Sequence, residues 1–325
     1  KSFEFYSAKE VKAKRPYLEK MALRTSLLHN FLNAAKLNKF ILKNYCKEKK
    51  DNLKIFTEAI RNDLANDYVS KALYTYKNSK SCITKVPMEL KKEIMVHLFE
   101  NKHESDFLAF VEENKLIKPF NAEISFYYER LFWKYYGNSK IKEAQFLNRI
   151  RKLKNDKAKL LLTSLSKYQN FRKEVDKFSK IRISIKKKDP NPNVFIGKLT
   201  ARMGKMKALG QKADQIFGLG HGQVSVLVYD QLTRLTADFA LEVDQYVMPI
   251  PDKEFQKQFK GEMTKISASI RSESQNFKNK SQELIEKYEL LIVKRDDSHM
   301  AHDILEISDI RPPASQMAIT LGLGK

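Results

Sequence analysis

Apolar residues recur at alternating steps of four and three positions through the C-terminal third of the chain. Residues 199–217 follow this heptad rhythm, residues 228–246 nearly continue it, and a third apolar line runs through residues 259–291. Such a repeat is typical of helices that pack along a common seam. The chain has only 10 glycines and 9 prolines in 325 residues, which favours long helices with short connections. The pattern predicts an all-α fold with a three-helix, antiparallel, coiled-coil-like bundle over residues 194–293.

The N-terminal part also carries helix signals, but they share no single seam. Ser7 and Glu10 have the spacing of a capping box, Pro16 suits the first turn of a second helix, and Asp51 can cap a later one. No fixed period of a repeat family is visible. Residues 1–185 are therefore expected to form a basic helical bundle or an irregular helical solenoid.

The clearest boundary lies in the segment IRISIKKKDPNPN. The isoleucines of residues 181–185 alternate with polar residues as in a short strand, and two prolines then prevent a continuing helix. We expect a proline-containing linker at residues 186–193 between the N-terminal module and the three-helix bundle. The tail, residues 294–325, lacks a helical pattern and is expected to be extended.

The net charge of +22 resides in the first part of the chain. Residues 1–200 hold 44 basic and 22 acidic side chains, whereas the remaining 125 residues hold 17 of each. Residues 141–190 are the most basic stretch, with 16 basic and 5 acidic side chains. A field of this size attracts polyanions, which include nucleic acid, anionic lipid headgroups and acidic protein surfaces.

This basic stretch can also be an ordinary solvated helix face. An apolar stripe, expected to be buried, runs beside it through Ile141, Phe146, Leu147, Ile150 and Leu153. The charge alone does not choose between these interpretations or among polyanions. The predicted basic face consists of Lys140, Lys142, Arg149, Arg151, Lys152, Lys154, Lys186, Lys187 and Lys188.

Three glycines surround one histidine in the segment GLGHG. Their spacing is not that of a dinucleotide-binding loop, and a heptad helix rather than a strand precedes them. The favoured interpretation is a turn, in which Gly218 ends a helix in a left-handed cap and Gly220 and Gly222 let the chain reverse. The alternative is a hairpin tip that docks into a partner or touches lipid. The residues of that tip would be Ile216, Phe217, Leu219 and His221.

An aromatic helix is expected over residues 126–138, with the sequence FYYERLFWKYYGN. A helix that is apolar on most sides is usually buried between two layers. The alternative is an aromatic surface beside lysines, which would suit single-stranded nucleic acid.

Few residues offer redox or metal chemistry. Cys46 and Cys82 are either two unrelated thiols or one disulfide between helices of an exported protein. His299 and His302, with aspartates nearby, could hold a divalent metal, although an ordinary polar linker is the simpler interpretation. No cofactor motif is present, and no metal or cofactor is expected.

These features point to interaction rather than catalysis. No catalytic signature is visible, and no stretch reaches the roughly 20 apolar residues that span a bilayer. The first residue is Lys1 rather than Met, so either a leader has been removed or the sequence starts internally. We expect a non-enzymatic scaffold component of a larger assembly, exported or associated with a bacterial envelope, with protein partners or further copies of itself. The alternative is a cytoplasmic nucleic-acid-binding protein that uses residues 140–188.

Overall fold

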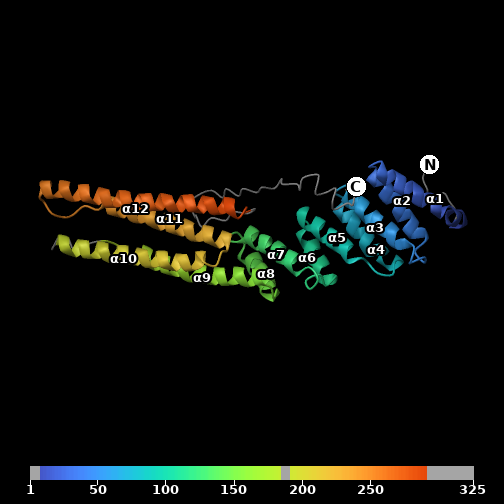
Figure 1. Cartoon of the computed structure of the whole chain (residues 1–325), viewed down its shortest axis with the longest axis horizontal. Coiled ribbons are helices and arrows are strands. Elements are labelled where there is room, and N and C mark those ends of the chain that lie inside the picture. The colour runs from blue at the N-terminus through green and yellow to red at the C-terminus, as the bar shows by residue number, and fades with distance from the viewer. Residues whose placement is uncertain (1–7, 184–190, 291–325) are drawn as a thin grey trace. The chain divides into compact units, whose positions relative to one another are not determined.

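The computed structural model describes residues 8–183 and 191–290, with side-chain burial from Lys14 onward. Within these residues the chain forms twelve α-helices and one short 3-10 helix, and it contains no strand (Figure 1). The all-α class predicted from the sequence is confirmed. The predicted residues that lie outside the described ranges include Ser7, Lys186, Lys187, Lys188, His299, His302 and the tail at 294–325.

The first compact unit, Lys1–Ile124, is a series of helices in which each packs against the next. The sequence predicted two helices around Pro16, but this residue lies inside one continuous helix. Leu18 and Ala22 after the proline are buried, and their packing offsets the backbone hydrogen bond that proline removes. The helices of this N-terminal unit are α1 (Ala8–Leu27), α2 (Phe31–Asn44), α3 (Asn52–Leu64), α4 (Val69–Ser79), the 3-10 helix η2 (Lys80–Cys82), α5 (Met88–Glu100) and α6 (Glu104–Glu113).

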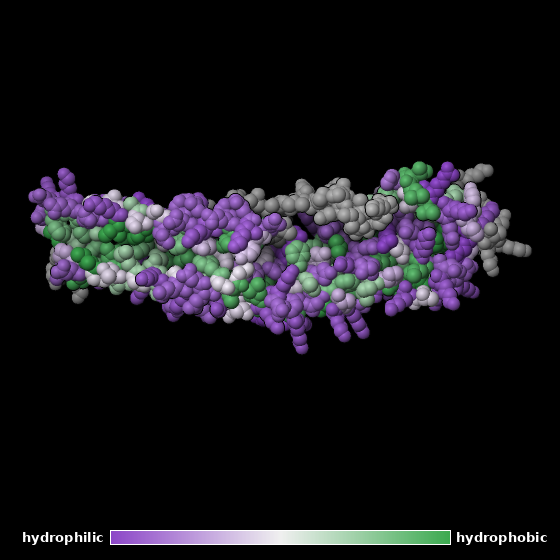
Figure 2. All heavy atoms as spheres, viewed as in Figure 1, coloured by the Kyte–Doolittle hydropathy of each residue, from purple (hydrophilic) through white to green (hydrophobic). Residues whose placement is uncertain are grey.

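The second compact unit, Ser125–Lys325, begins inside a helix that both units share. Figure 2 shows hydrophobic side chains on one face of this unit, between hydrophilic rows over its long helices. The helices of this C-terminal unit are the larger part of α7 (Asn121–Tyr135), then α8 (Lys140–Lys152), α9 (Asp156–Ser179), α10 (Pro192–Phe217), α11 (Gly222–Gln245) and α12 (Lys253–Lys287).

The predicted linker at 186–193 does not separate the two compact units. The helices on either side of it, α9 and α10, pack side by side, and α9 also packs on α11. The strand expected around Ile183 is likewise absent from the described residues 181–183. The Ile183 backbone N–H instead donates to the Glu242 carboxylate on α11, at 2.7 Å, so it is not offered to a neighbouring strand.

The most extensive helix contact of the C-terminal unit joins α11 and α12, which run antiparallel. Three buried serines at intervals of seven residues line the contact. Ser267 Oγ donates to the Ala240 carbonyl at 3.0 Å, and Ser274 Oγ donates to the Thr233 carbonyl at 2.9 Å. Ser281 Oγ bonds the Asp230 carboxylate at 3.2 Å. Because serine is small, the backbones of α11 and α12 approach closely at these positions. The contact surface of α12 therefore contains a row of serines in addition to its apolar residues.

Candidate interaction surfaces

A disulfide joins Cys46, which follows α2, to Cys82 at the end of η2. Next to it lies Asn52, a fully buried residue whose Nδ2 donates to the carbonyls of Tyr45 at 2.7 Å and Cys82 at 3.1 Å. Its Oδ1 accepts from the Arg15 guanidinium at 3.2 Å. The disulfide is therefore part of a buried polar hub that ties α1, the α2–α3 connection and η2 together.

A cluster of exposed apolar side chains lies at the C-terminal end of α1. Leu23, Leu27 and Leu28, here called the leucine cluster, are 48%, 66% and 72% exposed. Leu23 and Leu27 are one turn apart and so lie on the same side of the helix. Tyr17, on an earlier turn of α1, is also exposed. Large apolar side chains that gather on a surface, rather than being scattered singly, mark protein contacts.

The aromatic helix α7 is buried, as the favoured interpretation predicted. Tyr128, Phe132 and Trp133 are all below 5% exposed, and among the large hydrophobic residues of the helix only Phe126 is clearly exposed. The predicted stacking platform for single-stranded nucleic acid is thus turned into the core.

The basic face of α8 is partly exposed and partly packed. Lys140, Arg151, Lys152 and Lys154 are exposed, whereas Arg149 is half-buried with its guanidinium 5.9 Å from the Tyr128 ring. Lys142 donates to the Tyr135 hydroxyl at 2.9 Å. Two of the predicted cations therefore also serve contacts within the unit.

One member of the apolar stripe of α8 was placed wrongly. Phe146, Ile150 and Leu153 are buried as predicted, but Ile141 is 84% exposed. It lies in the first turn after Ser139, whose side chain caps the helix, and at that position the helix turns it away from the core. Ile141 thus adds an apolar side chain to a surface otherwise rich in lysine.

The GLGHG segment forms a turn between α10 and α11, as the favoured interpretation predicted. The left-handed residue is Gly220, with φ of 76°, and not Gly218, which is helical with φ of −60°. Gly222 is required for packing, because a Cβ there would lie 2.7 Å from the Tyr288 ring at the end of α12.

The alternative interpretation of this turn, an exposed hairpin tip, does not hold. Ile216 and His221 are buried, and Phe217 and Leu219 are half-buried. Phe217 stacks on Tyr229 with ring centroids 4.2 Å apart. His221 Nδ1 accepts the Val224 N–H at 3.4 Å, and its Nε2 lies 3.2 Å from the Glu129 carboxylate. The Phe217 ring and both imidazole nitrogens of His221 are thus engaged within the unit and are not available to a partner.

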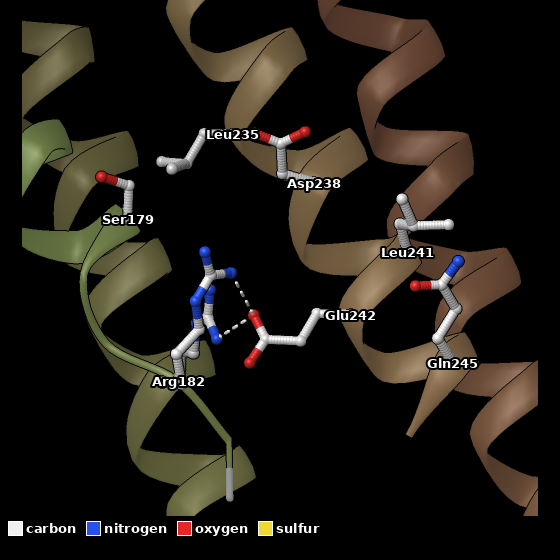
Figure 3. A pocket seen from close by; sticks show the side chains of 8 residues that line it. Ser179, Arg182, Leu235, Asp238, Leu241, Glu242 and Gln245 are labelled. Atoms are coloured by element: carbon white, nitrogen blue, oxygen red, sulfur yellow. Dashed lines mark hydrogen bonds and ion pairs between the residues drawn. The ribbon is translucent and has the colours of Figure 1, made fainter. Parts of the chain in front are cut away.

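A buried ion pair holds α9, α10 and α11 together (Figure 3). The Arg202 guanidinium lies 4.9 Å from the Phe178 ring and 4.7 Å from the Phe239 ring, and it donates to Glu242 at 2.5 Å. Burial disfavours the charged carboxylate, but the Ile183 N–H and the two arginines outweigh this and lower the pKa of Glu242. Arg182 is the second arginine, at 3.3 Å. A hollow of about 390 Å³ adjoins the pair, and Asp238 also lines it.

The described residues give no metal centre and no membrane span. No three of their histidine, cysteine, aspartate or glutamate side chains are grouped so that they could hold an ion. None of the described helices is both long and apolar enough to cross a membrane. Comparison of the chain with known protein families, with curated proteins and with solved structures found no match.

Proposed function

We propose that this chain is a non-enzymatic interaction component of an exported, envelope-associated assembly, and that its leucine cluster binds a protein partner. The observation that carries the proposal is the exposure of Leu23, Leu27 and Leu28 at the end of a helix whose opposite face is buried. Full burial of an exposed leucine side chain is worth about 1.5–3 kcal/mol, and each of these leucines, which are 48–72% exposed, forgoes part of that energy. A partner surface that covers them recovers this energy.

The surroundings of the cluster suit a protein interface. Interfaces combine an apolar centre with a polar rim. Here Tyr17, Lys20 and Arg24 are exposed beside the cluster on α1 and can supply that rim. Tyrosine and arginine are among the residues that contribute most to binding at such surfaces.

The disulfide supports the exported part of the proposal. Disulfides persist in oxidising compartments and are rare in the cytosol of ordinary organisms. The Cys46–Cys82 bond belongs to the polar hub with Asn52, so it is integral to the N-terminal unit. Alkylation in intact cells tests this point: both thiols should resist the reagent until a reductant is added, and rapid labelling without reductant would contradict export.

The protein contact is tested by a photo-crosslinking residue placed at Leu27 in the full-length protein in its own cells. We expect a discrete adduct of defined mass, which disappears when Leu23 and Leu28 are both changed to serine. The matched control places the crosslinker at Tyr74, which is 69% exposed on α4. Equal adducts at both positions, or none at Leu27, would count against the leucine cluster as the binding surface.

A further inference from the structure

One end of the C-terminal unit carries exposed aliphatic side chains around an aromatic stack. Phe195 in α10 stacks on Tyr246, which follows α11, with ring centroids 4.3 Å apart. The chain neighbours of these rings point outward: Val194, Ile196 and Val247 are 48%, 53% and 70% exposed. These three residues, here called the aliphatic tip, therefore sit on a rigid base at the end where α10 begins (Figure 1).

The helix that leads away from the tip is cationic and has no carboxylate for most of its length. No Asp or Glu occurs from Pro192 to Ala213. Arg202 is buried and neutralised by Glu242, so it adds little to the surface charge. The exposed cations, here called the lysine row, are Lys198, Lys205 and Lys212 on one side of the helix and Lys207 on the opposite side. Of these, Lys212 lies 3.6 Å from the Glu174 carboxylate on α9.

The excess of positive charge lies in α9 and α10 and not in α11 and α12. The helices α9 and α10 together hold 11 basic and 4 acidic side chains, whereas α11 and α12 together hold 9 of each. Gly197, Ala201, Gly204 and Ala208 form an exposed line of small residues on α10, and a Cβ at Gly197 or Gly204 would meet nothing within 4 Å. No bulky side chain on that line keeps the α10 backbone away from a flat surface.

We propose that the aliphatic tip and the lysine row bind an anionic lipid surface. Valine and isoleucine gain free energy by entering the acyl boundary, while lysines beside them reach the headgroup phosphates. The surface cations of α10 are all lysines, which act as point charges and suit a fluid layer of phosphates. The proposal does not depend on the leucine cluster, which lies in the other compact unit.

Nucleic acid fits this surface less well. Binding of single strands relies on exposed aromatic rings, and the aromatic helix α7 is buried. Exposed valine and isoleucine contribute nothing to phosphate recognition. The disulfide also indicates a compartment in which nucleic acid is not the usual polyanion.

The test is co-sedimentation of the full chain with vesicles of equal parts phosphatidylglycerol and phosphatidylcholine, compared with vesicles of phosphatidylcholine alone. We expect salt-sensitive binding to the anionic vesicles only. The variants Lys205→Glu/Lys207→Glu and Val194→Ser/Ile196→Ser/Val247→Ser should each weaken it by about tenfold or more. All five side chains are exposed, so unfolding midpoints should stay close to that of the original protein.

Matched controls test whether the position of the substituted residues matters, and not only the change in net charge or hydrophobicity. Lys278→Glu/Lys280→Glu makes the same charge change on exposed residues of α12 and should leave binding within about twofold. Serine at all three positions of the leucine cluster should not change vesicle binding, so failure of the proposed function and failure of this proposal are distinguishable. Absence of vesicle binding, equal binding to neutral vesicles, or no loss in the two site variants would overturn the proposal. So would oligonucleotide binding that only Lys205→Glu/Lys207→Glu removes, without vesicle binding.

Discussion

His221 Nε2 lies 3.2 Å from the Glu129 carboxylate, which links the turn before α11 to the aromatic helix α7. Trp133 Nε1 donates to the same carboxylate at 3.2 Å, and its ring centroid lies 6.1 Å from that of His221. The other imidazole nitrogen of His221 accepts the N–H of Val224. One side chain therefore caps α11 and fixes the turn against α7.

Changing His221 to alanine removes both interactions. A lost helix cap costs about 1 kcal/mol, and a lost bond to a charged partner adds a similar amount. We expect His221→Ala to lower the free energy of unfolding by roughly 2 kcal/mol, measured by urea titration of the full chain. His103→Ala is the control, because His103 precedes α6 without capping it through its side chain. Equal effects of the two changes would show that the link to Glu129 is not stabilising.

The disulfide should stabilise the N-terminal unit mainly by constraining the unfolded chain. It closes a loop with a sequence separation of 36 residues, for which the chain-entropy account gives roughly 4 kcal/mol. Adding a reductant should therefore shift the urea midpoint of the N-terminal unit well downward. The variant Cys46→Ser/Cys82→Ser should unfold at the lower midpoint already and show no further shift with reductant. A reductant effect of equal size in that variant would mean that the bond is not its cause.

The sequence predicted the helical class and the buried state of α7, because both follow from periodicity and composition within one segment. It did not predict the seam of α12 fully, since Ser267, Ser274 and Ser281 are polar by composition. They become core residues only because their hydroxyl groups reach α11. A search for small residues at heptad spacing could have found them.

The surfaces were harder to predict than the core. The sequence allowed a binding tip at the glycine turn, but Tyr288 and Glu129, which are both distant in sequence, contact this turn. The aliphatic tip was missed because Val194 and Ile196 flank the buried Phe195, and exposure cannot be told from hydrophobicity alone. Likewise, the boundary between the two compact units lies inside α7 because α9 packs on α10 and α11. The positions of prolines in the sequence do not reveal these contacts.

The Arg202–Glu242 pair should make stability depend on acid pH. The pKa of Glu242 is lowered in the folded protein, so its contribution is present above the unfolded pKa and is lost as the pH falls through the folded pKa. At neutral pH Glu242→Gln should cost about 2 kcal/mol, because it leaves the guanidinium of Arg202 buried without its counter-charge.

Urea titrations from neutral to acid pH measure this dependence. The difference between the original protein and Glu242→Gln should shrink as the pH falls below the ordinary range of glutamate. Adding Arg202→Met to Glu242→Gln should recover part of the loss at neutral pH, because no unpaired charge then remains buried. A difference that stays constant with pH would contradict ionic stabilisation by this pair.

The nucleic-acid alternative makes a separate prediction on α8 and the turn after it. If these cations bind nucleic acid, Arg151→Glu/Lys152→Glu/Lys154→Glu should abolish salt-sensitive binding of a fluorescent oligonucleotide. Because the aromatic residues of α7 are buried, we expect the unaltered protein to bind such a probe weakly and without base preference. Tight binding that the triple variant removes would favour the alternative over the scaffold proposal.

Two glycines should respond oppositely to alanine because their surroundings differ. At Gly222 a Cβ would lie 2.7 to 2.9 Å from Cγ, Cδ2 and Cβ of Tyr288, and atoms so near the tyrosine backbone cannot swing away freely. Gly222→Ala should therefore cost about 1–3 kcal/mol in urea titration. Gly204 lies inside α10 with nothing within 4 Å of its Cβ position, so Gly204→Ala should stabilise by roughly 1 kcal/mol through helix propensity. In a Tyr288→Gly background, which removes all three of these atoms, Gly222→Ala should lose most of its cost. If that cost persists, the close approach of α12 is not what requires glycine in the GLGHG turn.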